Sequence, residues 1–415
     1  MTNREREILT LSFSNEGLDR GAKEETMEPW DLTIMNWQKQ GLDTDFNQRM
    51  GLPSVPTEIG FIRKDGDVEP ADHYYMTMLA DAVFDLEKKI GYDPVVRMAF
   101  RIPFLSYEEK ILEDTERYYI KRDVDGWIRK YSKGCHVGTS LEAMAVKPVV
   151  WDEESWEKHK EHTLEAYKKY CTDEAMLARY GKYQEISETG KYPIRFRLMG
   201  FFWIIRDLMD NEPMLYSWYD YPEMLHDIHR FQMDIYKEQM DKILKIVKPS
   251  VLFFEEDLSG KNGPLISPAT FDEFLKPCYE EMIPFLKERG VSQVIVDTDG
   301  DFTKLIPNFV SAGVDGFLPV DVNAGVDIVQ VRKQFPGVKF IGGFNKLEII
   351  KGPEAIDREF KRLEPVIRQG GYLCGIDHQA APDTPYEYYQ YYVKRLGEVM
   401  AQWRGEQFKI KQDNR

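Results

Sequence analysis

Cysteine is scarce in this sequence, and its placement excludes two common kinds of small-domain architecture. The 415 residues include four cysteines, Cys135, Cys171, Cys278 and Cys374, which lie far apart and form no CxxC pair. Neither a disulfide framework nor a cysteine zinc ribbon is therefore indicated. Cys135 is followed by His136, but neighbouring side chains on a strand point to opposite faces, so this pair is a poor metal site. We expect reduced thiols in a cytoplasmic protein.

Long hydrophobic runs and basic clusters are also missing. The best apolar run, Phe201–Ile205, ends at Arg206, far short of the roughly 20 residues that a membrane helix needs. The charged N-terminus is not followed by the apolar core of a signal peptide. Acids outnumber bases by 71 to 55, which gives a net charge of -16, and the bases are scattered. Phosphate-backbone binding requires a basic stripe, so we predict neither a membrane nor a nucleic-acid partner.

Two nucleotide-binding motifs, GxGxxG after a first strand and GxxxxGK[ST], are absent as well. What the second half contains instead is a fivefold alternation of strand-like and helix-like segments. The expected strands are 250–254, 294–296, 316–320, 339–344 and 372–376, and the expected helices are 268–289, 303–312, 327–334, 353–368 and 385–403. This alternation predicts parallel strands joined by right-handed helical crossovers, in a doubly wound sheet or a barrel. Polar residues follow all five strands, which favours a (β/α)8 TIM barrel in the α/β class, because barrels place functional residues at several strand ends.

The first half is expected to add structure around that barrel. We predict an N-terminal elaboration over residues 1–135, packed on the barrel, and the main part of one barrel domain over residues 136–415. Within these limits the pattern predicts helices at 76–90, 152–169, 204–209 and 222–246, a strand at 194–200, and a hairpin turn at Asp125-Gly126. Trp151 and Trp156 are the expected buried anchors of helix 152–169. His226 and His229 share a helical face, but without a third ligand they are better explained as core or surface histidines than as a zinc pair.

The candidate functional residues follow the predicted strands. In Val294–Asp301 a β-branched run ends in acids, and Asp297 and Asp299, two residues apart, would point to one face while Gly300 turns the backbone. The other polar strand endings are Glu256 and Asp257, Asp321, Asn345 and Lys346, and Asp377 and His378.

These endings lie within motifs that resemble the uroporphyrinogen decarboxylase-like superfamily. The motifs are Glu256-Asp257, Lys261–Pro268, Asp297-Thr-Asp-Gly, Ala324–Asp327, Gly342-Gly343, Gly370–His378 and Pro382-Asp383, and the resemblance is continuous from about residue 190 to 400. It implies a (β/α)8 barrel. The superfamily includes porphyrinogen decarboxylases and zinc-dependent methyltransferases that work with corrinoid proteins, so the resemblance alone does not fix the reaction.

The motifs lie nearer the methyltransferase side. The arginine-rich N-terminal signature of the decarboxylases is absent, and Asp297-Thr-Asp299 stands where thiol-activating methyltransferases carry His-x-Cys. The resemblance therefore implies an enzyme that moves a methyl group from a small methoxylated compound, such as an aryl methyl ether, or another methylated substrate to the cobalt of a corrinoid protein, as in an O-demethylase. An oxygen-rich ligand set suits a methoxy donor better than a thiol.

Roles follow for individual residues. The expected zinc ligands are Glu256, Asp299 and His378, the expected catalytic residues are Asp299, His378 and Lys346, and the expected substrate-binding residues are Asp297, Asp321, Asn345 and Asp377. The expected partners are a small-molecule methyl donor, a corrinoid protein and a second copy of the chain. Three alternatives stay open: acids that only hydrogen-bond neighbouring loops without zinc, a decarboxylase of a polycarboxylate, and a noncatalytic binder of a corrinoid or tetrapyrrole.

Overall fold

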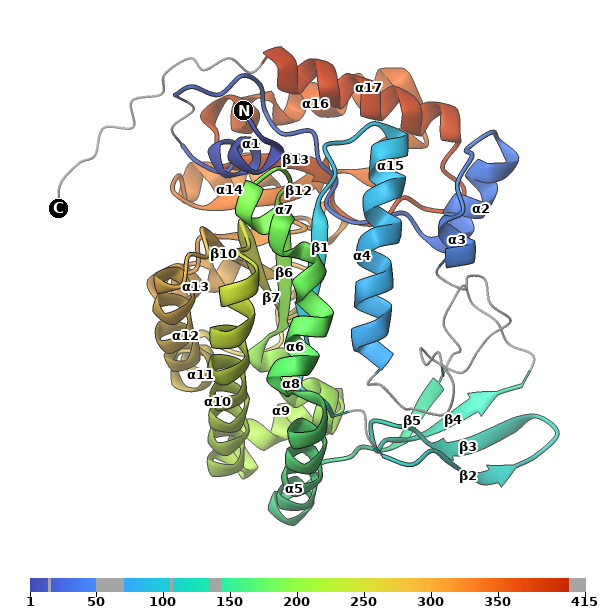
Figure 1. Ribbon diagram of the computed structural model, residues 1–415, viewed down its shortest axis with the longest axis vertical. Coiled ribbons are helices and arrows are strands. Elements are labelled where there is room, and N and C mark those ends of the chain that lie inside the picture. The colour runs from blue at the N-terminus through green and yellow to red at the C-terminus, as the bar shows by residue number, and fades with distance from the viewer. Residues whose placement is uncertain (14–15, 50–70, 105–106, 134–142, 403–415) are drawn as a thin grey trace.

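A parallel, curled sheet forms the centre of the molecule (Figure 1). The computed structural model describes residues 1–13, 16–49, 71–104, 107–133 and 143–402. The sheet contains, in spatial order, β1 (Val96–Phe100), β6 (Ile194–Met199), β7 (Val251–Glu255), β10 (Gln293–Asp297), β11 (Gly316–Leu318), β12 (Lys339–Phe344) and β13 (Tyr372–Ile376). Every neighbouring pair is parallel. The predicted α/β class and TIM-barrel-like fold are confirmed, with seven strands paired among the described residues instead of eight.

Alternation along each strand builds two cores. On β10, Val294 and Val296 face the surrounding helices and join the large outer core. Ile295 points the other way and packs with Val251 and Ile341 in a smaller core inside the curled sheet. All five residues of β10 are buried, and the three between Gln293 and Asp297 are β-branched and apolar, as expected for a parallel strand covered on both faces.

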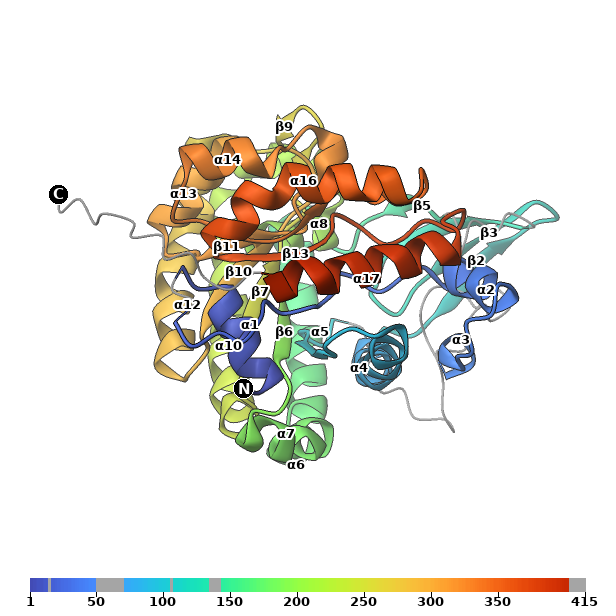
Figure 2. The ribbon, with the colours of Figure 1, turned by 90° about the horizontal axis from the view of Figure 1, so that it is seen from above.

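Helices follow the strands and cover the outer face of the sheet (Figure 2). They include α8 (Phe201–Met209), α9 (Asn211–Asp220), α10 (Pro222–Ile246), α12 (Lys276–Glu288), α13 (Ile306–Ser311), α14 (Ile328–Gln334), α15 (Lys346–Ile349), α16 (Pro353–Gln369) and α17 (Tyr386–Gln402). The five predicted βα units of the second half are all present. Helix α9 was not predicted. A π-helical turn at Phe271–Leu275, which was not predicted either, interrupts the helix expected at 268–289. No helix in the described ranges is long and apolar enough to cross a membrane.

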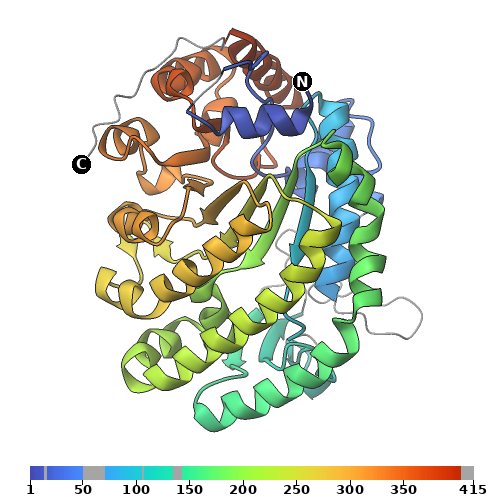
Figure 3. The same cartoon turned by 60° about the vertical axis from the view of Figure 1, so that its left-hand side comes forward.

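The N-terminal helix α1 (Asn3–Thr10) closes the amino-terminal end of the sheet. Figure 3 shows it, in dark blue, at the end opposite the cyan antiparallel strands. Its Glu7 is fully buried and accepts a hydrogen bond from Arg195 Nε at 2.8 Å and one from the hydroxyl of Ser250. Leu11 and Ala22 then enter the inner core. The first residues of the chain are therefore part of the barrel's interior.

The chain after α1 fills the space between the two outermost strands. Glu25 accepts a hydrogen bond from Arg97 on β1 through its backbone oxygen, at 3.2 Å. Its Oε1 accepts one from the Ile376 amide on β13, at 2.9 Å. Residues 22–26 thus lie where an eighth strand would stand. Because β1 also belongs to the sheet, the barrel includes parts of the segment that was predicted to be an N-terminal elaboration.

A small antiparallel sheet projects at the end to which the carboxyl ends of β1 and β6 point (Figure 1). It contains β2 (Lys110–Asp114), β3 (Tyr118–Arg122), β4 (Ile128–Ser132) and β5 (Ala143–Lys147), and the predicted hairpin at Asp125-Gly126 joins β3 to β4. Trp127 Nε1 donates to the Asp207 oxygen of α8 at 2.8 Å, which anchors the hairpin to the barrel.

The two predicted aromatic anchors of the next helix have different environments. That helix, α5, spans Glu153–Tyr170. Trp156 is buried as predicted, whereas Trp151 is 43 % exposed. The prediction for Trp151 was wrong because the residue precedes the helix, where the Lys147 ammonium group lies over its ring instead. The long helix α4 (Ala71–Ile90) contains the predicted segment 76–90.

Candidate functional site

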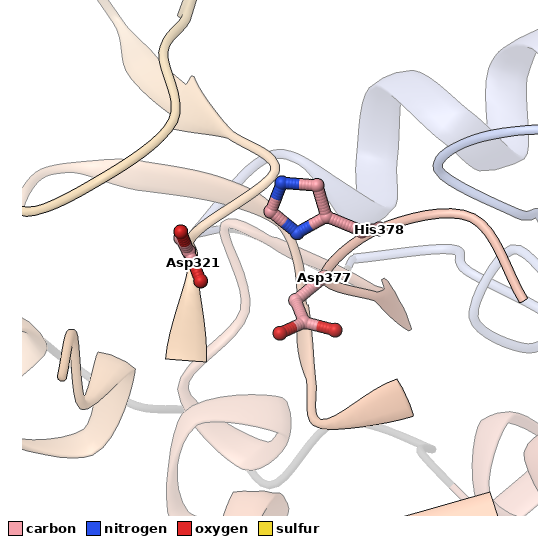
Figure 4. A group of neighbouring side chains, drawn as sticks. All are labelled: Asp321, Asp377 and His378. Atoms are coloured by element: carbon pink, nitrogen blue, oxygen red, sulfur yellow. The ribbon is translucent and has the colours of Figure 1, made fainter. Parts of the chain in front are cut away.

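The carboxyl ends of the strands bring six polar side chains into two adjoining groups. Asp321, Asp377 and His378 form the first group, drawn in Figure 4. Asp257, Asp297 and Asp299 form the second. In each group the potential ligand atoms lie within 4.8 Å of one another. We call the six residues together the acid–histidine cluster.

His378 joins the two groups. Its Nε2 lies 2.9 Å from Asp299 Oδ1, so the imidazole of one group is hydrogen-bonded to a carboxylate of the other. Burial alone would lower the pKa of His378, but the hydrogen bond and the negative charges of Asp299 and Asp377 outweigh it and raise the pKa above its ordinary value. Asp299 and His378, which were both predicted to be zinc ligands, therefore lie in direct contact.

Asp297 is the most isolated carboxyl group of the cluster. It is 9 % exposed, and its carboxyl oxygens accept no hydrogen bond from the described residues. Burial, together with the charges of Glu255, Asp257 and Asp299, raises its pKa well above the ordinary range. Burial and the charge of Asp299 likewise raise the pKa of Asp257 to about 6. Crowded, desolvated carboxyls of this kind are typical of functional sites.

Asp321 and Asp377 also fix the loops that carry them. Asp321 Oδ1 accepts hydrogen bonds from the amides of Asn323 and Ala324, each at 3.0 Å, and its Oδ2 accepts one from Gly300 at 3.3 Å. Asp377 is fully buried and accepts from Asn323 Nδ2 at 3.0 Å. Asp321 Oδ2 and the two oxygens of Asp377 each accept one hydrogen bond from the described residues and so retain a lone pair for a ligand.

Asn345 and Lys346 lie at the N-terminus of α15, beside Asp377. Asn345 caps this helix by accepting the Leu347 amide at 3.0 Å. The Lys346 amide donates to Asp377 Oδ1 at 3.0 Å. The Lys346 ammonium group forms no ion pair or hydrogen bond with the described residues, Asp321 included.

Glu256, a predicted zinc ligand, points away from the cluster. Its carboxylate accepts the amides of Phe201, Phe202 and Trp203 at 2.9, 2.7 and 3.1 Å, and the hydroxyl of Tyr279 donates to it. The first turn of a helix has unpaired amides that attract an anion. α8 begins just after β6, and the last residue of β6, Met199, is paired with Glu255 at the end of β7, so Glu256 lies beside the first turn of α8 instead of in the cluster. Burial nevertheless raises the pKa of Glu256 to about 7.

Other candidate metal ligands are structural. His229 is buried with Nε2 2.9 Å from the Phe201 oxygen, and His226 stacks on Phe274, which agrees with the preference for packed histidines. Burial raises the pKa of Cys374 to about 12, which disfavours a thiolate at this strand. Cys135-His136 lies outside the described residues.

A cavity of about 230 Å³ lies inside the curled sheet and includes Asp297 in its wall. Three arginines line it, Arg97 from β1 and Arg195 and Arg197 from β6, together with Glu255 and Phe253 from β7. The sequence analysis did not select these arginines. The alternation Ile-Arg-Phe-Arg in β6 was the available signal, because alternate residues of a barrel strand face its interior.

Comparisons with known proteins agree with this architecture. The family model described as uroporphyrinogen decarboxylase (URO-D) matches residues 202–399. A methyltransferase from Methanosarcina mazei has a similar fold, with a TM-score of 0.57 and 14 % identity, over 96 % of this chain and 99 % of that chain.

A second solved structure, provisionally assigned as a vitamin-B12 independent methionine synthase from Listeria monocytogenes, has a TM-score of 0.40 and 10 % identity over 85 % of this chain and 99 % of its own. None of the curated proteins compared with the sequence matches it. The matched residues 202–399 contain β7 to β13 and the acid–histidine cluster, so this part of the chain is similar to the uroporphyrinogen decarboxylase family.

Proposed function

We propose that this protein is a methyltransferase that passes a methyl group from a small methoxylated or otherwise methylated compound to the cobalt of a partner corrinoid protein. The observation that carries the proposal is the acid–histidine cluster at the carboxyl end of the barrel, which adjoins a cavity inside the sheet through Asp297. In barrels this end holds the reacting groups. A cavity of about 230 Å³ suits a molecule smaller than a typical drug-sized ligand.

The donors of the cluster fit a divalent metal ion. Asp321, Asp377 and His378 offer two carboxylates and one imidazole within 4.8 Å of one another, a mixed oxygen and nitrogen set that zinc accepts. With Glu256 engaged by α8, we propose this group as the zinc-binding set, with Asp299 as the hydrogen-bonding partner of His378 that orients its ring. A bound zinc ion would supply Lewis-acid stabilisation of the oxygen from which the methyl group departs.

The chain's own residues have separate tasks in this proposal. The cavity wall positions the donor and keeps water away from it, and the apolar Phe253 and Ile341 provide packing surface. The raised pKa of Asp297 favours a neutral carboxyl, which can donate a hydrogen bond to an oxygen of the donor. The free ammonium group of Lys346 adds positive charge near Asp377 and His378, where it would offset the negative charge that develops on the leaving oxygen.

Methyl transfer to free cob(I)alamin tests the function. The purified protein would be incubated with cob(I)alamin and a panel of methoxylated aromatic compounds and methylamines, and formation of methylcobalamin would be followed by absorbance. We expect transfer from at least one donor, reduced at least about 100-fold by His378→Ala, since removing one positioned catalytic group costs that much. Asp383→Asn, an exposed acid on the loop after His378, is the matched control. No methylcobalamin from any donor would overturn the proposal.

Elemental analysis tests the metal separately. We expect about one zinc per chain, lost in His378→Ala and retained in Glu256→Gln, because Glu256 contacts amides and Tyr279 instead. Retention of zinc in the His378 variant would overturn the proposed ligand set.

A second candidate function is decarboxylation of a small polycarboxylate, and the three arginines in the cavity wall favour it. The size of the cavity disfavours a porphyrinogen, because even drug-sized ligands occupy about 300–1,000 Å³. Release of carbon dioxide from a small polycarboxylic acid, without methyl transfer, would support this candidate.

A further inference from the structure

The cavity inside the sheet has opposite charges at its two ends. The register of the strands places Arg97 beside Arg195 at the deeper level, nearest α1. Arg197 lies one level higher, opposite Phe253. Glu255 and Asp297 are paired at the top, next to the acid–histidine cluster. A molecule lying along the barrel axis therefore meets arginines at one end and the cluster at the other.

The wall of the cavity also contains a buried hydroxyl group. The hydroxyl of Thr26 is buried and has no hydrogen-bonding partner among the described residues, although Thr26 lines the cavity. Unsatisfied buried polar groups are costly and uncommon in folded proteins. The unpartnered hydroxyl of Thr26 in the wall of the cavity, with the carboxyl group of Asp297 also in that wall, points to a polar ligand.

Of the three arginines, Arg197 is the one that can meet such a ligand. Arg195 is held by Glu7 and Glu24 and its side chain is 4 % exposed. Arg97 pairs with Glu87 at 2.7 Å and is 11 % exposed. Arg197 pairs with Glu255 at 3.0 Å, yet 30 % of its side chain stays exposed.

Each of these arginines is paired with at least one acid, and Glu28 also lines the cavity. The deeper end therefore carries guanidinium groups that are already partly neutralised, and Arg197 is the one with exposed surface. Guanidinium groups bind carboxylates with directed, charge-assisted hydrogen bonds.

We infer that the methyl donor is a small carboxylic acid with one ring, which binds with its carboxylate at Arg197 and the hydroxyl of Thr26 and with its methoxy group toward the acid–histidine cluster. This inference rests on the proposed function for the methoxy group, but the carboxylate site stands on the cavity alone. Phe253, level with Arg197 in the register, provides an aromatic surface for the ring. A single ring with a carboxylate and a methoxy group is of the size that about 230 Å³ admits.

Isothermal titration calorimetry with three probes tests the inference: 4-methoxybenzoate, benzoate and the neutral methoxybenzene. We expect both acids to bind, and methoxybenzene to bind at least about tenfold more weakly, because it leaves the arginine without its anion. Arg197→Gln should weaken both acids by roughly 10- to 100-fold while changing the affinity for methoxybenzene little. Arg230→Gln, an exposed arginine on α10 paired with Glu281, is the matched control.

Turnover with the same compounds separates this inference from the proposed function. Arginine-dependent binding of benzoate and 4-methoxybenzoate, with no methyl transfer from these or from any other donor of the panel, would support the carboxylate site and overturn the function. Equal turnover of methoxybenzene and 4-methoxybenzoate, unaffected by Arg197→Gln, would overturn the carboxylate site and support the function. If Arg197→Gln does not fold, Thr26→Val serves instead, because it removes only the hydroxyl, and an unchanged affinity for both acids would contradict the inference.

Discussion

Gly300 is the residue at which the local backbone most tightly constrains the acid–histidine cluster. Its φ is +75°, and a Cβ built there would lie 2.5 Å from the Ser259 backbone oxygen. Its amide donates to Asp321 Oδ2 at 3.3 Å, and it directly follows Asp299. A side chain would therefore displace the turn that holds Asp299 beside His378.

Gly300→Ala should lower the free energy of unfolding by about 1–3 kcal/mol, the usual cost of backbone strain, and should reduce activity more than stability alone explains. Urea denaturation measures the first effect and the methylcobalamin assay the second. Gly260→Ala is the control, because a Cβ there meets nothing within 4 Å. Equal effects in the two variants would contradict the explanation.

His159 gives the protein a stability that depends on pH. It is a buried residue of α5, the hydroxyl of Tyr107 lies 2.8 Å from its Nδ1, and burial lowers its pKa from 6.5 to about 3. Between these two values the unfolded chain binds a proton that the folded protein rejects. Stability is therefore complete above about pH 6.5 and falls as the pH decreases toward 3.

We expect this residue to cost the wild-type protein about 1 kcal/mol between pH 6.5 and pH 5.5. Urea denaturation at both pH values, compared with the nontitrating variant His159→Gln, isolates the contribution. Identical pH dependence in the two proteins would show that His159 does not titrate as the structure implies.

At the scale of elements, α1 covers the amino-terminal end of the barrel and is held there by a network of buried ion pairs. Glu7 and Glu24 both pair with Arg195, and all three side chains are at most 4 % exposed. Removing one member of such a network leaves a charge buried with reduced compensation, which typically costs 3–5 kcal/mol.

Glu7→Ala should therefore destabilise the protein by about 3 kcal/mol. The substitution also removes the acceptor of the hydrogen bond from the Ser250 hydroxyl. Glu154→Ala, which breaks the exposed pair with Lys158 on α5, should cost at most about 0.5 kcal/mol. Thermal and urea denaturation of both variants would check the contrast, and similar losses would mean that α1 is not held by this network.

The elements of the second half were predictable because each is a short apolar strand followed by an amphipathic helix. The strands predicted at 339–344 and 372–376 have the same bounds as β12 and β13. The segment around Glu25 was not predictable, since residues 22–26 form no strand and reach β1 and β13 through a backbone oxygen and a side chain. Contacts of that kind leave no periodic signal in a sequence.

The sequence predicted which residues lie at the ends of strands. It did not predict in which direction the individual side chains point. Asp299 and His378 meet as expected. Glu256 stands one residue beyond β7, and only the start of α8 beside it determines that its carboxylate caps a helix. Arg197 was overlooked because it lies inside the strand, where its orientation toward the cavity depends on barrel curvature.

At the scale of the whole molecule, the net charge of -16 opposes folding by self-repulsion. Sodium chloride screens surface charges, with a Debye length of about 10 Å at 0.1 M. We therefore expect the melting temperature at pH 7.5 to rise between about 20 mM and 200 mM salt, and the rise to shrink near pH 5, where the charges balance. Scanning calorimetry at both pH values would detect this difference. A melting temperature that falls with salt at pH 7.5 would show that attractive pairs dominate instead.

Asp297 connects the cavity inside the sheet with the acid–histidine cluster. Its carboxyl group belongs both to the cavity wall and to the group formed with Asp257 and Asp299. A molecule in the cavity and an ion or proton in the cluster would therefore draw on the same oxygen atoms. Any change that binding at one place makes in the affinity at the other is equal in both directions, as thermodynamic linkage requires. The side chain that ends β10 is therefore the structural connection through which the cavity and the cluster would be coupled.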